Sequence, residues 1–144
     1  MKVLSLLQPW ASLVVKGAKK IETRTWTTTH RGDLAIHASL GKKAADLAKE
    51  KPFNKYIKDF GALPFGAIIG KVVLVDVVRI DPFKNLDQLM KRIDADEKAF
   101  DDFTEGRYAW ILEEPVVFEN VIPVKGSLGI WEYEVFLNPK ARRT

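Results

Sequence analysis

The sequence contains no cysteine, only two histidines and no run of 18 apolar residues. Without cysteine, disulfides, thiolate nucleophiles and zinc sites with cysteine ligands are excluded. The histidines, His30 and His37, have no aspartate or glutamate at ligand spacing, so we predict no metal site. No segment is apolar enough to span a membrane, and the short apolar start, residues 3–7, does not resemble a secretory signal. A cytoplasmic protein without membrane contact is therefore expected.

The overall amino-acid composition is that of an ordinary globular protein. The chain has 144 residues, of which 47% are hydrophobic and 29% are charged. This length suits one domain with a real core, so residues 1–144 are predicted to form a single domain with a frayed tail at 138–144. Neither a phosphate loop, a dinucleotide fingerprint nor a Ser/His/Asp triad pattern is present, and no cofactor is expected.

Charge is unevenly distributed along the chain. Residues 1–80 carry 14 basic and 6 acidic side chains, whereas residues 81–105 carry 4 basic and 8 acidic ones. The N-terminal half could therefore present a basic face to an anionic polymer such as nucleic acid. The alternative is that the six lysines between Lys42 and Lys58 only cover a solvated helix surface.

Hydrophobic patterning predicts a mainly β domain. Strands are expected at residues 3–7, 21–26, 34–38, 67–78, 108–112, 116–121 and 130–136. Gly70, inside the strongest of these, suggests a bulge or bend. Helices are expected from Pro9 to a stop at Gly17, over residues 42–60 with an interruption at Pro52, and over residues 86–100. We predict an α+β fold of mostly antiparallel strands with two or three peripheral helices.

Most of the unusual polar residues lie between Gln8 and Ser39. The centre of this stretch, residues 17–24, reads Gly-Ala-Lys-Lys-Ile-Glu-Thr-Arg, or Gly-x-Lys-x-x-Glu-x-Arg. A lysine, a glutamate and an arginine within six positions, directly after a predicted helix end, can form a small charged pocket. Alternation along the following strand places Glu22, Arg24 and Trp26 on one face.

This motif, preceded by Gln-Pro-Trp-Ala at residues 8–11, resembles the signature of the ASCH (activating signal cointegrator 1 homology) domain. Arg31-Gly32, the strand at residues 66–78 and the segment Pro-Val-Lys-Gly at 123–126, followed by Ile130-Trp131, resemble the same family in the same order. The resemblance implies a PUA-like β-barrel flanked by helices, with a cleft lined by the signature residues. It also implies a link to RNA and nucleic-acid binding. Some small members resemble N4-acetylcytidine hydrolases, and ribonuclease activity is assigned to others.

Whether the sequence predicts a binding site or a catalytic site depends on Lys19 and Glu22. The resemblance implies a catalytic lysine at the position of Lys19, and a desolvated lysine can act as base or nucleophile. The nearby Glu22 carboxylate, however, favours the ammonium form of Lys19. Glu22 also stands where the small hydrolases carry threonine. We therefore expect a binding site first, with Lys19 and Glu22 as a catalytic pair of a modified-nucleoside hydrolase, or a ribonuclease, as the alternatives.

Several other residues have two open interpretations. Arg24 could contact a phosphate or stack on a base, or it could pair only with Glu22. Trp26 could offer a stacking platform or belong to the core or rim. Trp10 is in register with apolar helix positions and is expected in the core. His37 is expected to have a buried, hydrogen-bonded role in preference to acid–base work.

The predicted ligand is RNA or a nucleotide-derived molecule. Free N–H groups at the helix start beside Gln8 and Pro9 would attract anions. Lys19, Arg31 and Lys125 would attract phosphate, and Glu22 could accept from an exocyclic amino group. The predicted ligand-binding residues are Gln8, Pro9, Trp10, Lys19, Glu22, Arg24, Trp26, Arg31, Ser39, Lys125 and Gly126.

Overall fold

The computed structural model describes residues 1–134. Its elements follow the order β1 (Lys2–Leu6), α1 (Trp10–Val15), β2 (Ile21–Arg24), β3 (Gly32–Ala38), η1 (Leu47–Lys49), α2 (Phe53–Tyr56), η2 (Phe60–Ala62), β4 (Ala67–Arg79), α3 (Leu86–Lys91), α4 (Ala95–Phe100), β5 (Tyr108–Pro123) and β6 (Ile130–Glu132), where η marks a 3-10 turn. Among the described residues, no helix is long and apolar enough to cross a membrane.

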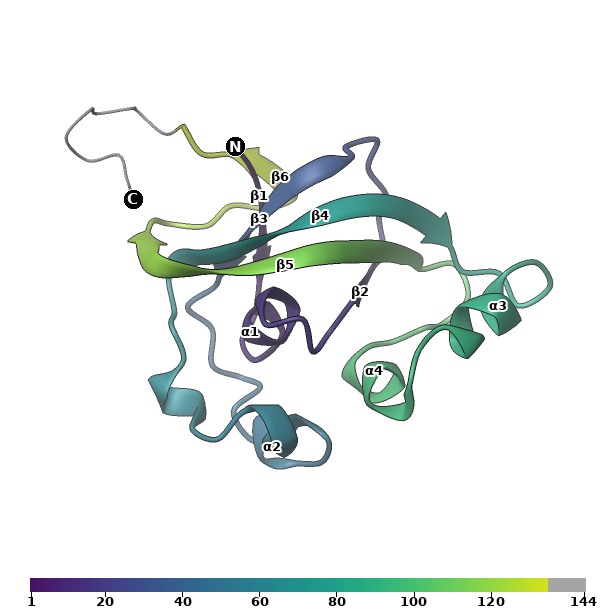
Figure 1. Ribbon diagram of the computed structural model, residues 1–144, viewed down its shortest axis with the longest axis horizontal. Coiled ribbons are helices and arrows are strands. Elements are labelled where there is room, and N and C mark those ends of the chain that lie inside the picture. The colour runs from purple at the N-terminus through teal and green to yellow at the C-terminus, as the bar shows by residue number, and fades with distance from the viewer. Residues whose placement is uncertain (135–144) are drawn as a thin grey trace.

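The six strands form one curled sheet in the order β2-β5-β4-β3-β1-β6 (Figure 1). β1 and β3 pair in parallel, and the other neighbours are antiparallel. This mixed, mostly antiparallel half-barrel, flanked by short helices, agrees with the predicted α+β architecture.

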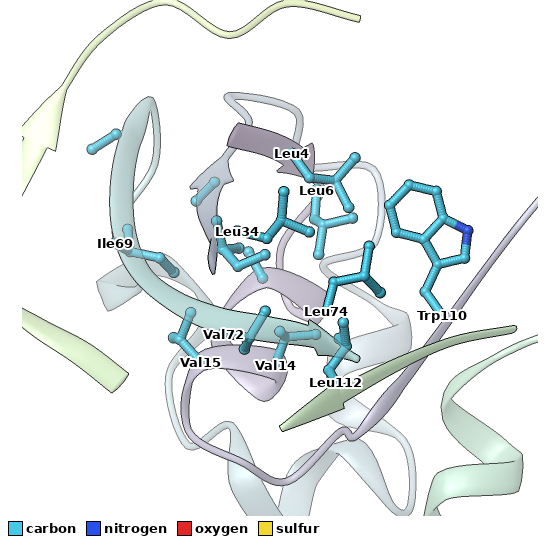
Figure 2. Packing of buried hydrophobic residues seen from close by; sticks show 14 residues of the cluster. Leu4, Leu6, Val14, Val15, Leu34, Ile69, Val72, Leu74, Trp110 and Leu112 are labelled. Carbon is cyan, nitrogen blue, oxygen red and sulfur yellow. The ribbon is translucent and has the colours of Figure 1, made fainter. Parts of the chain in front are cut away.

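The main hydrophobic cluster lies between α1 and the concave face of the sheet. Val14 and Val15 of α1 face Val72 and Leu74 of the curved strand β4 (Figure 2). The predicted stop of this helix at Gly17 is confirmed. Gly17 has φ +81°, a conformation that glycine adopts without steric cost, and its N–H donates to the Val14 carbonyl. A short, almost entirely buried helix therefore packs against this face of the sheet.

The strand predicted at residues 67–78 is observed as β4, with irregular register at three places along its pairing with β5. One of them lies at Gly70, where a bulge was predicted. On β5, the two predicted strands merge into one long strand. Glu114, with φ +50°, and Pro115 lie between the paired residues Glu113 and Val116, so a bulge accommodates the proline that has no N–H to donate.

The helical segments are shorter and more divided than predicted. Residues 42–60 form only η1, α2 and the start of η2 in place of one interrupted helix. Residues 86–100 divide into α3 and α4, because the Asp94 carboxylate accepts from the Glu97 N–H and begins a new helix. The predicted strand 130–136 ends at Glu132. Residues 135 and 136, and the predicted frayed tail, lie outside the described residues.

Candidate functional site

A cleft in two connected halves lies beside the ends of β1, β2 and β3. We call the first, of about 580 Å³, the carboxylate half; it is lined by Glu22, Asp101 and Asp102 together with two arginines and several aromatic rings. We call the second, of about 830 Å³, the loop half, because the loop at residues 124–129 forms one wall. The two halves share three lining residues, Ser5, Arg24 and Ser39.

Lys19 lies beneath the carboxylate half and is only 1% exposed. Its Nζ donates to Glu22 Oε1 at 3.0 Å, to Asp101 Oδ2 at 2.7 Å and to the Ile21 carbonyl. Burial alone would lower the pKa of Lys19, but the attraction of the Glu22 and Asp101 carboxylates raises it above its ordinary value. Lys19 is thus a buried ammonium that supports the cleft floor; it neither reaches the cleft surface nor offers a free amine.

Glu22, Arg24 and Trp26 form one connected group at the surface of the cleft. Arg24 Nη1 donates to Glu22 Oε2 at 3.2 Å, and its guanidinium carbon lies 5.5 Å from the Trp26 ring centroid. Trp26 in turn packs edge-on against the fully buried Trp110, with centroids 4.9 Å apart. Arg24 thus pairs with Glu22, as one interpretation predicted, and its side chain also lines both halves of the cleft.

The segment at residues 101–107 completes the carboxylate half, and sequence reasoning missed it. Asp101 accepts from the N–H of Thr23 at 2.7 Å and from its hydroxyl at 2.6 Å. The single proton of the Thr23 hydroxyl has a second acceptor within reach, the Asp102 carbonyl at 2.7 Å, and Arg107 Nε donates to Thr23 Oγ1. Thr23 lines the cleft together with Glu22, although strand alternation predicted the opposite face. No pattern in the sequence of residues 81–105, the acidic stretch, indicates that its C-terminal end docks on β2.

A polar chain at the junction of the two halves joins Ser5, His37 and Trp131. Ser5 Oγ lies 3.1 Å from His37 Nδ1, Trp131 Nε1 donates to Ser5 Oγ at 3.1 Å, and His37 Nε2 lies 2.7 Å from the Val124 carbonyl. His37 is buried, as predicted. Ser5 was also missed. A signal existed, since Ser5 and His37 are each a single polar residue inside an apolar strand stretch.

The Gln8-Pro9-Trp10 stretch has a structural role in addition to any contact with the cleft. Gln8 is fully buried; its amide donates to the Pro64 carbonyl, and its Oε1 accepts from the Ser12 N–H. The backbone N–H of Leu13 donates a hydrogen bond to the Pro9 carbonyl. The N–H groups of Ser12 and Leu13 are therefore already hydrogen-bonded within the protein. Trp10 lines the carboxylate half and donates to the Phe100 carbonyl.

The remaining predicted residues divide between the cleft and the outer surface. Ser39 lines both halves, and Lys125 and Gly126 line the loop half. Arg31 lies elsewhere: its guanidinium donates to the carbonyls of Thr28 and His30 and lies 3.8 Å from an Asp76 oxygen. Arg24 of the motif and Lys125 therefore line the same half of the cleft, whereas Arg31 lies outside it.

A curled mixed sheet with a polar cleft of this kind defines a PUA-like domain. The model of the ASCH domain family matches residues 4–122, and the chain belongs to this family, which is generally linked to RNA binding. The chain is 28% identical over 149 residues to human "Activating signal cointegrator 1" and 27% identical over 150 residues to the mouse protein. Each alignment covers 97% of the chain but only 23% of the relative.

Solved structures agree on the fold. The ASCH protein of Zymomonas mobilis superposes with a TM-score of 0.54 at 19% identity, covering 84% of this chain and 71% of that chain. A mutant form of the same bacterial protein superposes with a TM-score of 0.52 over 84% of this chain and 73% of that chain, also at 19% identity. At this level of identity the likeness concerns the fold alone.

Proposed function

We propose that the cleft binds a nucleotide of single-stranded RNA, with the base in the carboxylate half and a phosphate in the loop half. The single observation that carries the proposal is the contrast between the joined halves. Three carboxylates line the first half, whereas the described residues that line the loop half include two cations, Arg24 and Lys125, and no acidic residue. Family membership supports RNA as the ligand class.

The carboxylate half has groups suited to a base that carries an amino group. A carboxylate oxygen can accept a hydrogen bond from an exocyclic amino group, as in contacts to cytosine N4. Hydrogen bonds from the hydroxyl and N–H of Thr104 hold the pKa of Asp102 below its ordinary value, so its carboxylate stays ionised. Arg24 and Trp26 supply planar surfaces on which an unstacked base can lie.

The loop half has groups suited to a phosphate. Lys125 and Arg24 line it, and Lys42 lies beside it, with Nζ 4.9 Å from the ring centroid of Phe65, another lining residue. Arginine can contact a phosphate through two parallel hydrogen bonds, whereas lysine acts as a point charge. A nucleotide that spans Ser5, Arg24 and Ser39 would thus have hydrogen-bond acceptors around its base and positive charges around its phosphate.

The test is a titration of short single-stranded oligonucleotides of adenine, cytosine or uracil, followed by tryptophan fluorescence. Arg24→Ala is expected to weaken binding about tenfold, since stacking alone contributes about 1–3 kcal/mol per base. Lys125→Ala should weaken binding of all three oligonucleotides alike and flatten the salt dependence. Adenine and cytosine should bind more tightly than uracil, which lacks the amino group.

Arg31→Ala is the matched control, because Arg31 is also an exposed arginine but lies outside the cleft. This substitution should leave the affinity for the oligonucleotides within about twofold of that of the unmodified protein. The proposal is wrong if Arg24→Ala and Lys125→Ala bind as tightly as the unmodified protein, or if Arg31→Ala has the same effect as Arg24→Ala.

A further inference from the structure

Ser5 and His37 are register partners on the neighbouring parallel strands β1 and β3. Parallel pairing places their side chains on the same face of the sheet, which brings Ser5 Oγ to 3.1 Å from His37 Nδ1. Ser5 is also one of the three residues shared by the two halves of the cleft. A hydroxyl with an imidazole partner therefore lies where a bound ligand would cross from one half to the other.

The protonation of the His37 ring follows from its other partner. The Val124 carbonyl can only accept, so His37 Nε2 must carry the proton that bridges their 2.7 Å separation. In the neutral ring, Nδ1 then has a free lone pair and accepts the Ser5 hydroxyl proton. The backbone carbonyl thus holds the imidazole in the tautomer that a general base for Ser5 requires.

Ser5 Oγ retains the means to attack a ligand. A hydroxyl has one proton and two lone pairs. The proton is directed at His37, and the Trp131 indole N–H occupies one lone pair, so one lone pair remains. Gly126 approaches closely: a Cβ at that position would lie 2.8 Å from Ser5 Oγ and 2.6 Å from His37 Cε1. Glycine there keeps a side chain out of the space around the hydroxyl.

Other hydroxyls and amines at the cleft lack this arrangement. The single proton of the Thr23 hydroxyl has two acceptors within reach, Asp101 Oδ1 and the Asp102 carbonyl, and neither is an imidazole. Lys19 is a buried ammonium held by two carboxylates. Ser39 lines the same junction, but among residues 1–134 its hydroxyl makes no hydrogen bond to a base.

We propose that Ser5 and His37 act as nucleophile and general base in the hydrolysis of a carboxylic ester bound across the junction. Ser5 Oγ attacks the carbonyl carbon while its proton passes to His37 Nδ1; the bond from the acyl carbon to the alcohol oxygen then breaks, and the alcohol leaves with that proton. Water next attacks the acyl carbon, giving its proton to His37. The acyl bond to Ser5 breaks, the carboxylic acid is released, and His37 returns the proton to Ser5.

Arg24 is placed to assist this step, since it lines both halves with Ser5 and can donate N–H groups to the carbonyl oxygen as negative charge develops there. The alcohol part of the substrate would carry an anion that meets Lys125. That assignment rests on the proposed function, whereas the acylation of Ser5 does not.

The test uses p-nitrophenyl acetate as the ester and follows both p-nitrophenolate release and the site of acetylation by peptide mass analysis. The full chain should acetylate at Ser5 and release p-nitrophenolate in a burst. Ser5→Ala should lose the burst, and His37→Gln, which keeps hydrogen-bonding groups without a base, should slow it at least about 100-fold. Thr29→Ala removes an exposed hydroxyl that lies outside both halves of the cleft, and this variant should react at the rate of the unmodified protein.

A second variant covers the case in which Ser5→Ala does not fold. Because the chain has no cysteine, Ser5→Cys introduces a single thiol. Its alkylation by iodoacetamide should slow at least about tenfold when His37→Gln is added, since the imidazole activates the thiol. The proposal is overturned if Ser5 is not acetylated, if Ser5→Ala retains the burst, or if His37→Gln leaves thiol alkylation unchanged. Oligonucleotide binding by Ser5→Ala, measured separately, shows whether the proposed function stands independently.

Discussion

Lys19 is a charged residue whose surroundings come from distant parts of the chain. Its pairing with Glu22 was predicted from a three-residue spacing, but Asp101 lies 82 positions away and its approach could not be predicted. The second carboxylate changes the role of the residue. With two carboxylates and a backbone carbonyl around one ammonium, the charge of Lys19 is satisfied inside the protein and is not available to a ligand.

Removing the Lys19 charge should destabilise the protein strongly. Lys19→Met keeps much of the side-chain volume but leaves Glu22 and Asp101 without their shared cation. We expect a loss of about 3–5 kcal/mol in the free energy of unfolding, measured by urea denaturation at neutral pH. Lys20→Met, at the exposed neighbouring position, is the control and should change stability by less than about 0.5 kcal/mol. Equal stability of the two variants would contradict the buried network.

Glu97 gives a pH-dependent prediction. It is 4% exposed and accepts from the N–H groups of Lys20 and Ile21. Burial raises its pKa above the ordinary value of 4.5, although the Lys20 amide and the Lys19 charge oppose this. The folded state therefore binds the Glu97 proton more tightly than the unfolded chain. This contribution to stability is complete below the ordinary pKa and is lost as pH rises through the folded-state pKa.

Glu97→Gln removes that titration. Between about pH 4 and about pH 7, the unfolding free energy of the original protein should fall relative to that of Glu97→Gln, with a slope of at most about 1.4 kcal/mol per pH unit. Urea denaturation of both proteins across this range measures the difference. Parallel stability curves would show that Glu97 has the same pKa in both states.

At the scale of elements, β4 shows how a single glycine permits the curl of the sheet. Gly70 lies between α1 and the bulged part of β5, where a Cβ would stand 2.2 Å from the Val116 carbonyl oxygen and 2.8 Å from Val15 Cγ1. A glycine inside an otherwise β-branched strand predicted the bend. The two elements that meet there could not be predicted, because they come from opposite ends of the chain.

Gly70→Ala should therefore destabilise the protein by at least about 1–3 kcal/mol, since the methyl group must displace backbone. Thermal and urea unfolding measure the loss. Gly61→Ala is the matched control: its Cβ would meet only an Asp59 carboxylate oxygen, at 3.5 Å, and its stability should stay within about 1 kcal/mol of the original. A stable Gly70→Ala variant would mean that β4 and β5 are less tightly paired than the structure shows.

At the scale of the whole molecule, folding brings part of the acidic stretch, residues 81–105, against the basic N-terminal half. The acidic stretch docks on the basic N-terminal half through Lys19–Asp101 at 2.7 Å and Lys55–Asp96 at 2.6 Å. Its carboxylates also accept from the backbone of β2, at the N–H groups of Ile21 and Thr23. Near the cleft, Arg24 and Lys125 line the loop half, and Lys42 lies beside it.

The same docking predicts that residues 1–144 unfold as one unit. The four hydrophobic clusters draw on segments from both ends of the chain, and tryptophans report on three of them. Far-UV circular dichroism and tryptophan fluorescence should therefore give coincident urea midpoints. Trp110→Phe, which removes the fully buried indole, should shift both midpoints equally. Separate midpoints for the two signals would indicate two independently folding parts.

Local patterns were sufficient for the strands, for the helix stop at Gly17, for the shared face of Glu22 and Arg24, and for the resemblance that led to the family. These depend on side chains a few positions apart, where backbone geometry alone sets the spacing. Long-range contacts decided the rest: the burial of Lys19, the docking of Asp101 on Thr23, and the meeting of Ser5 with His37. Each depends on which strands become neighbours in the sheet, and that order is a property of the packed core. The motif is therefore readable in the sequence, whereas the tertiary structure determines which of its charges face a ligand.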